Sequence, residues 1–362
     1  ATTYENLKTE NSDENVVALN KNDDRNTKAA PNEHTFSELQ NIINAASSGS
    51  EIELQYDYLL TASDTTLRIN KPLTINGNNH ILNGMGRKRI LLANYSGGTS
   101  LTLKNIKFID GGGRDFNNEY KDDVGGAVFY NITGQSNPNN IPDLIIINCT
   151  FEDNGVTDAG GAVYATGGVQ IKDSHFFYNE VEQGNGGAVY AGGGSTVLNS
   201  IFEDNCVRHG VSGNLIPNIG SITDIVNYYH LSGTSGSIPS TGGAIFSKGL
   251  TKINDSVFKK NQVGEKNELG CGAGAVHSIG AINMSNCNFT GNIAYDQHGG
   301  AVLCNVHTHI YNCNFKDNIA NVGGAVSSFQ NFDAHNSTFQ NNGNQAGTTW
   351  IEEQSLDEAI SI

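Results

Sequence analysis

Short apolar runs separated by Gly and Asn dominate the chain from residue 52 onward. Early examples occupy residues 52–54, 67–69, 73–75 and 101–103. Each run is long enough for a strand but too short for a helix, and the residues between the runs favour turns. The pattern therefore predicts many short strands joined by tight turns.

One segment near the start has helical periodicity instead. Thr35 and Glu38 have the spacing of a capping box, in which each side chain satisfies a backbone donor of the other residue. Apolar residues then recur at helical spacing: Leu39, Ile42, Ile43 and Ala46. We expect a short amphipathic helix over residues 35–47 that covers the otherwise exposed end of a strand stack.

An internal repeat runs through the chain from about residue 105. It combines Phe-x-x-Asn with Gly-Gly-Ala followed by Val or Ile, and successive Phe spacings are 25, 26, 56, 31, 26 and 24 residues. The repeat Phe residues are Phe151, Phe176, Phe202, Phe258, Phe289, Phe315 and Phe339. The repeat Asn residues are Asn154, Asn179, Asn205, Asn261, Asn292, Asn318 and Asn342.

A repeat of this length predicts an all-β fold, a parallel β-helix solenoid with three short strands in each coil. About 300 residues at about 26 per coil give about eleven coils. Equivalent residues of stacked coils form ladders, so we expect the Phe residues to form an interior column. We expect the Asn residues to line a turn, with amides that bond neighbouring coils and a backbone at positive φ.

The pattern divides the chain into three parts. Residues 1–33 are polar and without sustained periodicity, which predicts a flexible leader or linker. Residues 34–350 form the predicted β-helix domain, and residues 351–362 a C-terminal tail. The long spacing between Phe202 and Phe258 leaves two alternatives: a coil that has lost its motif, or a loop inserted at about 206–240.

Composition narrows the classes of partner. The formal net charge is −16, and only 16% of residues are charged. Nucleic acids and anionic membranes require clustered Lys and Arg, so neither is an expected partner. No run of about 18 apolar residues is present, so we expect no direct membrane insertion.

The two repeat elements resemble those of the chlamydial polymorphic outer-membrane proteins. The opening TFSELQNIINAASSGSEIEL (35–54) and the coil LTINGNNHILNG (73–84) resemble adhesin-like surface proteins of methanogenic archaea more closely. The resemblance covers about residues 34–345. It implies a secreted or cell-surface, right-handed β-helix that serves attachment or the cell envelope, and it implies no catalytic residues.

Attachment requires a contact surface. Tyr228, Tyr229 and His230 in the long spacing are the candidate ligand contacts, because insertions in repeat folds form loops and aromatic side chains provide large contact areas. The expected partner is a glycan or protein on a host or neighbouring cell. End-to-end stacking into a homo-oligomer or filament is a further possibility, by strand addition at an uncovered end.

Two groups of residues have metal-binding chemistry. Carboxylates that would suit calcium lie among glycines at Asp110, Asp115, Glu119, Asp122 and Asp123. Histidines that would suit a softer metal, with Cys304, are His277, His298, His307 and His309. The alternatives are a solvated acidic loop and ordinary surface histidines, and we expect no resident cofactor.

Catalysis is the main competing function, since parallel β-helices also carry polysaccharide lyases and hydrolases. Asp153, Asp204 and Asp317 have the chemistry of an inverting pair. They recur at one repeat position, however, which is typical of a structural ladder. We therefore expect no enzyme, and the alternatives are a polysaccharide-degrading enzyme or a calcium-dependent carbohydrate-binding module.

Two further sets of residues bear on modification. Asn94 and Asn131 begin N-glycosylation sequons outside the repeat ladder. Cysteines that stand two positions before a repeat Phe should be free thiols, because stacked parallel side chains suit a disulfide torsion poorly: Cys149, Cys287 and Cys313. Cys206 and Cys271 are the pair in which a disulfide is to be sought.

Overall fold

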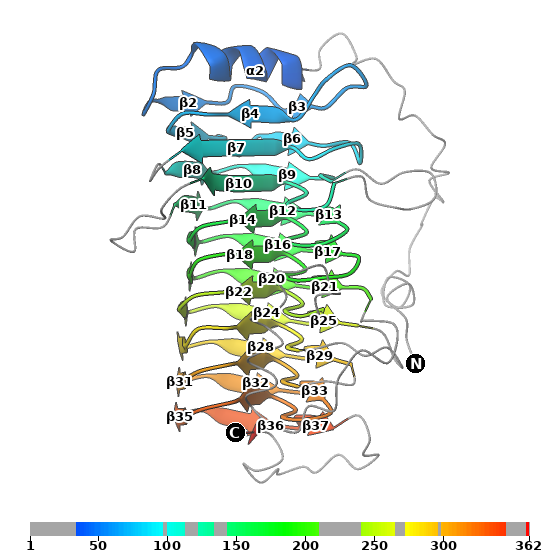
Figure 1. The fold of residues 1–362 in the computed structure, drawn as a ribbon, viewed down its shortest axis with the longest axis vertical. Helices are drawn as coiled ribbons and strands as arrows, with labels where there is room; N and C mark the ends of the chain where they lie inside the picture. The colour runs from blue at the N-terminus through cyan, green and yellow to red at the C-terminus, as the bar shows by residue number, and fades with distance from the viewer. Residues whose placement is uncertain are drawn as a thin grey trace.

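The computed structural model describes residues 34–96, 100–112, 122–133, 143–209, 240–264, 272–295, 298–344 and 360–361. These residues form one helix and a single stack of short strands along one axis (Figure 1). Within each sheet, every strand except the two at its ends pairs in parallel with the equivalent strands of the coils before and after it. The predicted right-handed parallel β-helix is confirmed.

The helix α2 (Phe36–Ala45) lies across the N-terminal end of the stack (Figure 1). Thr35 is its N-cap, and both bonds of the capping box to Glu38 are present. Phe36 is buried on the face toward the coils, whereas Ile42, expected on that face, is 44% exposed. No helix in the described residues is long and apolar enough to cross a membrane.

The first sheet contains eleven strands, and its middle residues point into the core. In stacking order it consists of β1 (His34–Thr35), β3 (Tyr58–Leu59), β6 (Ile81–Asn83), β9 (Lys107–Ile109), β12 (Thr150–Glu152), β16 (His175–Phe177), β20 (Ile201–Glu203), β24 (Val257–Lys259), β28 (Asn288–Thr290), β32 (Asn314–Lys316) and β36 (Thr338–Gln340).

The second sheet contains ten strands, in which buried and more exposed residues alternate. It consists of β2 (Glu51–Glu53), β5 (Leu73–Asn76), β8 (Leu101–Lys104), β11 (Leu144–Ile147), β15 (Val169–Lys172), β19 (Ser195–Leu198), β23 (Thr251–Asn254), β27 (Ile282–Ser285), β31 (Thr308–Tyr311) and β35 (Phe332–His335).

The third sheet also contains ten strands, and its last strand comes from the predicted C-terminal tail. It consists of β4 (Leu67–Ile69), β7 (Leu91–Ser96), β10 (Val128–Thr133), β14 (Val163–Ala165), β18 (Val189–Ala191), β22 (Ile245–Ser247), β26 (Val276–Ser278), β30 (Val302–Cys304), β34 (Val326–Ser328) and β38 (Ile360–Ser361).

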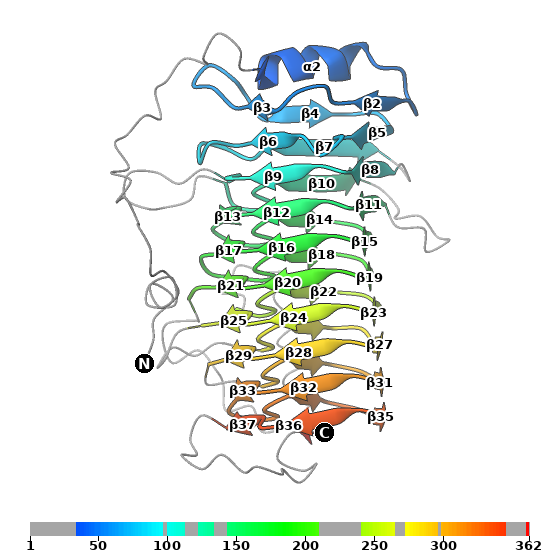
Figure 2. The same ribbon diagram turned by 180° about the vertical axis from the view of Figure 1, so that it is seen from behind.

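A fourth sheet, not expected from the sequence, runs beside the first from the middle of the molecule onward (Figure 2). Its seven strands are β13 (Gly155–Val156), β17 (Glu180–Val181), β21 (Cys206–Val207), β25 (Gln262–Val263), β29 (Ile293–Ala294), β33 (Ile319–Ala320) and β37 (Gly343–Asn344). Four of its inward valines form a buried cluster of their own. Each strand has only two residues, which is too short for a periodic signal.

The repeat Phe side chains stack as a column inside the first sheet. Adjacent rings are nearly parallel, with centroids 4.5–4.9 Å apart. Phe108 extends the column by one ring, 4.8 Å from Phe151. Because the rings stack at the spacing of parallel strands, each ring inside the column has two partners while the strands keep their register.

The repeat Asn side chains form a second, buried ladder. Asn205 is typical: its Nδ2 donates to Asn261 Oδ1 at 3.0 Å and to the Phe176 carbonyl at 2.9 Å. The expectation of positive φ at these Asn residues is wrong. The residue before each Asn adopts that conformation, as Asp204 does at +52°. The corner falls on this preceding residue, which leaves the Asn amide turned inward toward its neighbours.

The Gly pairs make a second corner. Gly160 has φ of +61°, in the left-handed region that favours glycine. At Gly161 an added Cβ would lie 2.1 Å from the carbonyl oxygen of Gly187 in the next coil. The first glycine thus supplies the conformation and the second permits the close approach of two backbones.

The long spacing is an insertion and not a degenerate coil. Ile201 on β20 pairs directly with Val257 on β24, so no coil lies between them. Cys206 and Val207 belong to β21, and the described chain continues to His209. The inserted segment is therefore shorter at its start than the predicted 206–240.

Candidate functional site

The predicted ligand contacts Tyr228, Tyr229 and His230 lie outside the described residues. Asp115 and Glu119 of the predicted calcium loop lie outside them as well. Ligand binding and calcium binding by these residues stay predictions.

The rest of the predicted calcium loop has structural roles. Asp110 occupies a turn at φ +52°. The Asp122 carboxylate accepts from the Arg89 backbone N–H and lies 3.7 Å from Arg89 Nη2. Asp123 accepts backbone N–H bonds from the next coil through its carbonyl. Among the described residues, no group of three or more His, Cys, Asp or Glu side chains is placed to hold a metal ion.

The histidines do not converge on one site. His277 is fully buried, with Nδ1 2.7 Å from Thr241 Oγ1 and Nε2 3.0 Å from Asn305 Oδ1. Because Oδ1 can only accept, Nε2 is the donor in the contact with Asn305. Burial lowers the pKa of His277 to about 4. His309 instead lies on the surface of β31, 3.5 Å from Asp333 Oδ2.

The proposed carboxylates and sequons also have defined places. Asp153, Asp204 and Asp317 all occupy the left-handed corner before a ladder Asn. Asn94 and Asn131 stand opposite each other on β7 and β10, and Asn131 Nδ2 donates to Asn94 Oδ1 at 2.9 Å. Glycosylation of either amide stays a prediction.

The buried free thiols of the described residues include Cys149, Cys287, Cys304 and Cys313. Burial raises the pKa of Cys149 to about 12, which makes this thiol a weak nucleophile. The Cys287 backbone N–H donates to Cys313 Sγ at 3.4 Å, as expected for consecutive rungs of a ladder. Cys271 lies outside the described residues, so its pairing with Cys206 stays a prediction.

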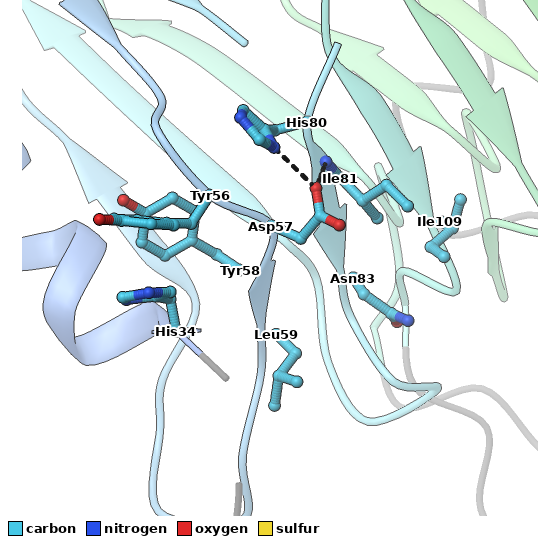
Figure 3. A pocket seen from close by; sticks show the side chains of 9 residues that line it. All are labelled: His34, Tyr56, Asp57, Tyr58, Leu59, His80, Ile81, Asn83 and Ile109. Atoms are coloured by element: carbon cyan, nitrogen blue, oxygen red, sulfur yellow. Dashed lines mark hydrogen bonds and ion pairs between the residues drawn. The ribbon is translucent and has the colours of Figure 1, made fainter. Parts of the chain in front are cut away.

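A pocket of about 510 Å³ opens on the outer face of the first sheet beside the helical cap (Figure 3). Leu59, Ile81 and Ile109 supply the apolar part of its lining. The aromatic and polar side chains that line it are His34, Tyr56, Asp57, Tyr58, His80 and Asn83.

The local sequence explains why these side chains meet. Tyr58 begins β3 and points into the core, so Asp57 and Leu59 on either side of it face outward. Asp57 Oδ1 accepts the Ile81 backbone N–H at 2.9 Å and lies 3.0 Å from His80 Nδ1. One carboxylate therefore connects the first coil to the second at the pocket.

The aromatic side of the pocket is also held in place. The rings of His34 and Tyr56 stack with centroids 3.7 Å apart and planes 15° apart. His34 Nδ1 lies 2.9 Å from Glu38 Oε2, the carboxylate of the capping box. Tyr56 remains 50% exposed despite the stack. Burial, together with the charge of Glu38, raises the pKa of Tyr58.

Sequence reasoning missed this pocket. The repeat contains no equivalents of Tyr56, Asp57 and His80. In the sequence, Asp57 and His80 are 23 residues apart. The available signal was the break in pattern itself, a Tyr-Asp-Tyr run (56–58) among coils that are otherwise apolar and amide-rich.

One segment of the repeat is similar to a known protein family. Residues 148–166 match the model of the Chlamydia polymorphic membrane protein (Chlamydia_PMP) repeat. This segment contains β12, β13 and β14, with one Phe-x-x-Asn element and one Gly-Gly-Ala element. No curated protein and no solved structure matches the chain. The chain thus contains a segment similar to the chlamydial repeat, and the resemblance to archaeal proteins stays a prediction.

Proposed function

We propose that this protein is an adhesin-like structural protein of the cell surface, which attaches its cell to another surface and catalyses no reaction. The match of residues 148–166 to a membrane-protein repeat, within a parallel β-helix that repeats the same elements, carries the proposal. Surface location is the property that the proposal takes from that family.

The ladders support a structural role. In the regular coils, the candidate carboxylates Asp153, Asp204 and Asp317 are corner residues, and the ladder thiols Cys149, Cys287 and Cys313 are buried. The proposed partner is a glycan or protein on a host or neighbouring cell. The N-terminal end is covered by α2, so the proposed strand addition concerns the C-terminal end of the stack. We propose attachment as the function and filament assembly at the C-terminal end as its variant.

Two measurements test the proposal. Antibody against the folded protein should label intact, unpermeabilised cells, and beads coated with the protein should adhere to a second cell or glycan surface more than beads coated with heat-denatured protein. A protein found only inside the cell, or native and denatured coats that adhere equally, would contradict the proposal.

A further inference from the structure

We propose that the N-terminal pocket binds a neutral saccharide, with Tyr56 as the stacking platform and Asp57 and Asn83 as the hydrogen-bonding groups. The inference rests on the proposed attachment function and deepens it by assigning a place and a ligand class. The pocket is lined by residues of the first coils, from His34 to Ile109.

The Tyr56 ring is both exposed and held in place. Tyr56 is among the large apolar side chains that stay exposed, at 50%, and its ring is fixed by the stack on His34. A pyranose presents a face of C–H groups, which carry partial positive charge and pack against the negative face of an aromatic ring. Because the ring is already held, little side-chain entropy remains to be lost when a ligand binds.

Hydrogen-bonding atoms of both kinds face the same pocket. Asp57 Oδ1 is occupied by His80 and the Ile81 N–H, and in the described part of the chain Oδ2 has no partner. Asn83 Oδ1 accepts the Met85 N–H at 2.6 Å, which fixes the amide and leaves Nδ2 as a donor. An acceptor and a donor in one pocket match a sugar hydroxyl, which both donates and accepts, and the Tyr56 ring lies at the other end of the same pocket (Figure 3).

The charges select against acidic sugars. No Lys or Arg is among the residues that line the pocket, while Asp57 lines it and Glu38 contacts His34. The nearest lysine in register, Lys107 opposite Ile81, is paired with Glu152 at 2.5 Å. The two histidines of the lining, His34 and His80, already contact Glu38 and Asp57. A carboxylate, sulfate or phosphate on the ligand would therefore compete with these carboxylates for the same partners.

The size is consistent with a short oligosaccharide. The cavity of about 510 Å³ falls within the roughly 300–1,000 Å³ of sites that hold drug-sized ligands. A disaccharide belongs to that size class, and the open side of the pocket leaves room for the chain to continue. The occupant inferred is thus one or two units of a neutral polysaccharide or glycan.

To test the inference, the whole protein is titrated with neutral gluco-, galacto- and manno-oligosaccharides of two to six units, and the Kd of each is measured. Sialylated, uronic-acid and sulfated oligosaccharides are titrated for comparison. We expect a neutral saccharide to bind with a Kd of about 1 mM or tighter. Tyr56→Ala should weaken binding at least about tenfold, while Tyr56→Phe should stay within about threefold because the ring is kept.

Tyr311→Ala is the matched control, since Tyr311 is a surface tyrosine with 49% exposure on the second sheet. It should bind saccharide as the wild type does. Circular dichroism melts of all variants establish that each is folded. Absence of neutral-saccharide binding, preference for acidic sugars, or equal loss in Tyr56→Ala and Tyr311→Ala would overturn the inference.

The two proposals fail separately. If coated beads adhere to cells and Tyr56→Ala beads adhere equally well, attachment stands and the saccharide site is wrong. If neutral saccharide binds with the expected dependence on Tyr56 but beads do not adhere, the site stands and the attachment function is wrong.

Discussion

The coils before residue 110 and those after residue 143 share three sheets, yet their turns are built differently. In the later coils a buried Asn bonds the coil before and the coil after it, and a glycine pair lets the backbones touch. The earlier coils have neither the ladder nor the fourth sheet. In these earlier coils, side chains such as Asp57 and Asn83 face outward and line the pocket.

The difference teaches where function is to be sought in such a scaffold. A ladder residue forms its hydrogen bonds with the equivalent residues of neighbouring coils. Polar groups that recur at one repeat position are therefore used by the fold and are not available to a ligand. Side chains that break the repeat retain unused donors and acceptors. Asp57 and Asn83 in the early coils are of this second kind.

The largest expected effect comes from the close backbone approach. Gly161→Ala places a Cβ 2.1 Å from the Gly187 carbonyl oxygen and 2.6 Å from that of Glu180. Two coils must separate, so we expect a loss of about 5 kcal/mol in unfolding free energy. Gly86→Ala, at φ +61° with nothing within 4 Å, should cost about 1 kcal/mol. Urea titrations followed by circular dichroism compare the two variants, and similar losses would mean that the close backbone approach at Gly161 adds nothing to the cost of the substitution.

Next in size is the amide ladder. Asn261→Ala removes the acceptor of Asn205 and the donor to the Phe202 carbonyl, both in a fully buried place. We expect a loss of about 4 kcal/mol, because several buried groups lose their partners. Asn314→Ala, an exposed amide on β32, should change stability by less than about 0.5 kcal/mol in the same titration. A loss of under about 1 kcal/mol at Asn261 would mean that the ladder is dispensable.

The pH dependence of the later coils follows from His277. Burial lowers its pKa from 6.5 to about 4, so the folded state favours the neutral ring. This stabilisation is complete above pH 6.5 and is lost as the pH falls toward 4, by about 3 kcal/mol at about 1.4 kcal/mol per pKa unit. In His277→Gln the decrease in unfolding free energy between these pH values should be smaller by this amount. If the unfolding free energy of His277→Gln decreases as much as that of the wild type, a group other than His277 causes the pH dependence.

The smallest effect concerns the cap that distinguishes the early coils. Thr35→Ala removes the side-chain acceptor of the Glu38 N–H, at 3.4 Å. We expect a loss of about 1 kcal/mol, in the range found for N-cap substitutions. Hydrogen exchange should localise the loss to α2 and the first coil. Faster exchange throughout the later coils would show that the cap stabilises the whole stack.

The parts of the fold that repeat were predictable, and the parts that occur once were not. Phe151 and its equivalents could be assigned to a column because each copy reports the same environment. Positive φ was assigned to the wrong residue, since the corner residue varies from Asp204 to Lys260 while the adjacent Asn does not. The pocket forms only because β3 and β6 pair in one particular register, and the sequence of either coil alone does not reveal that register.

The insertion after His209 has a practical consequence. Ser240 Oγ donates to the His209 carbonyl at 2.5 Å, so the chain leaves and re-enters the stack at one point. The rings of Phe202 and Phe258 on either side are 4.9 Å apart and within 2° of parallel, as though the intervening residues were absent. Foreign peptides or whole domains inserted between His209 and Ser240 should therefore be displayed without disturbing the solenoid.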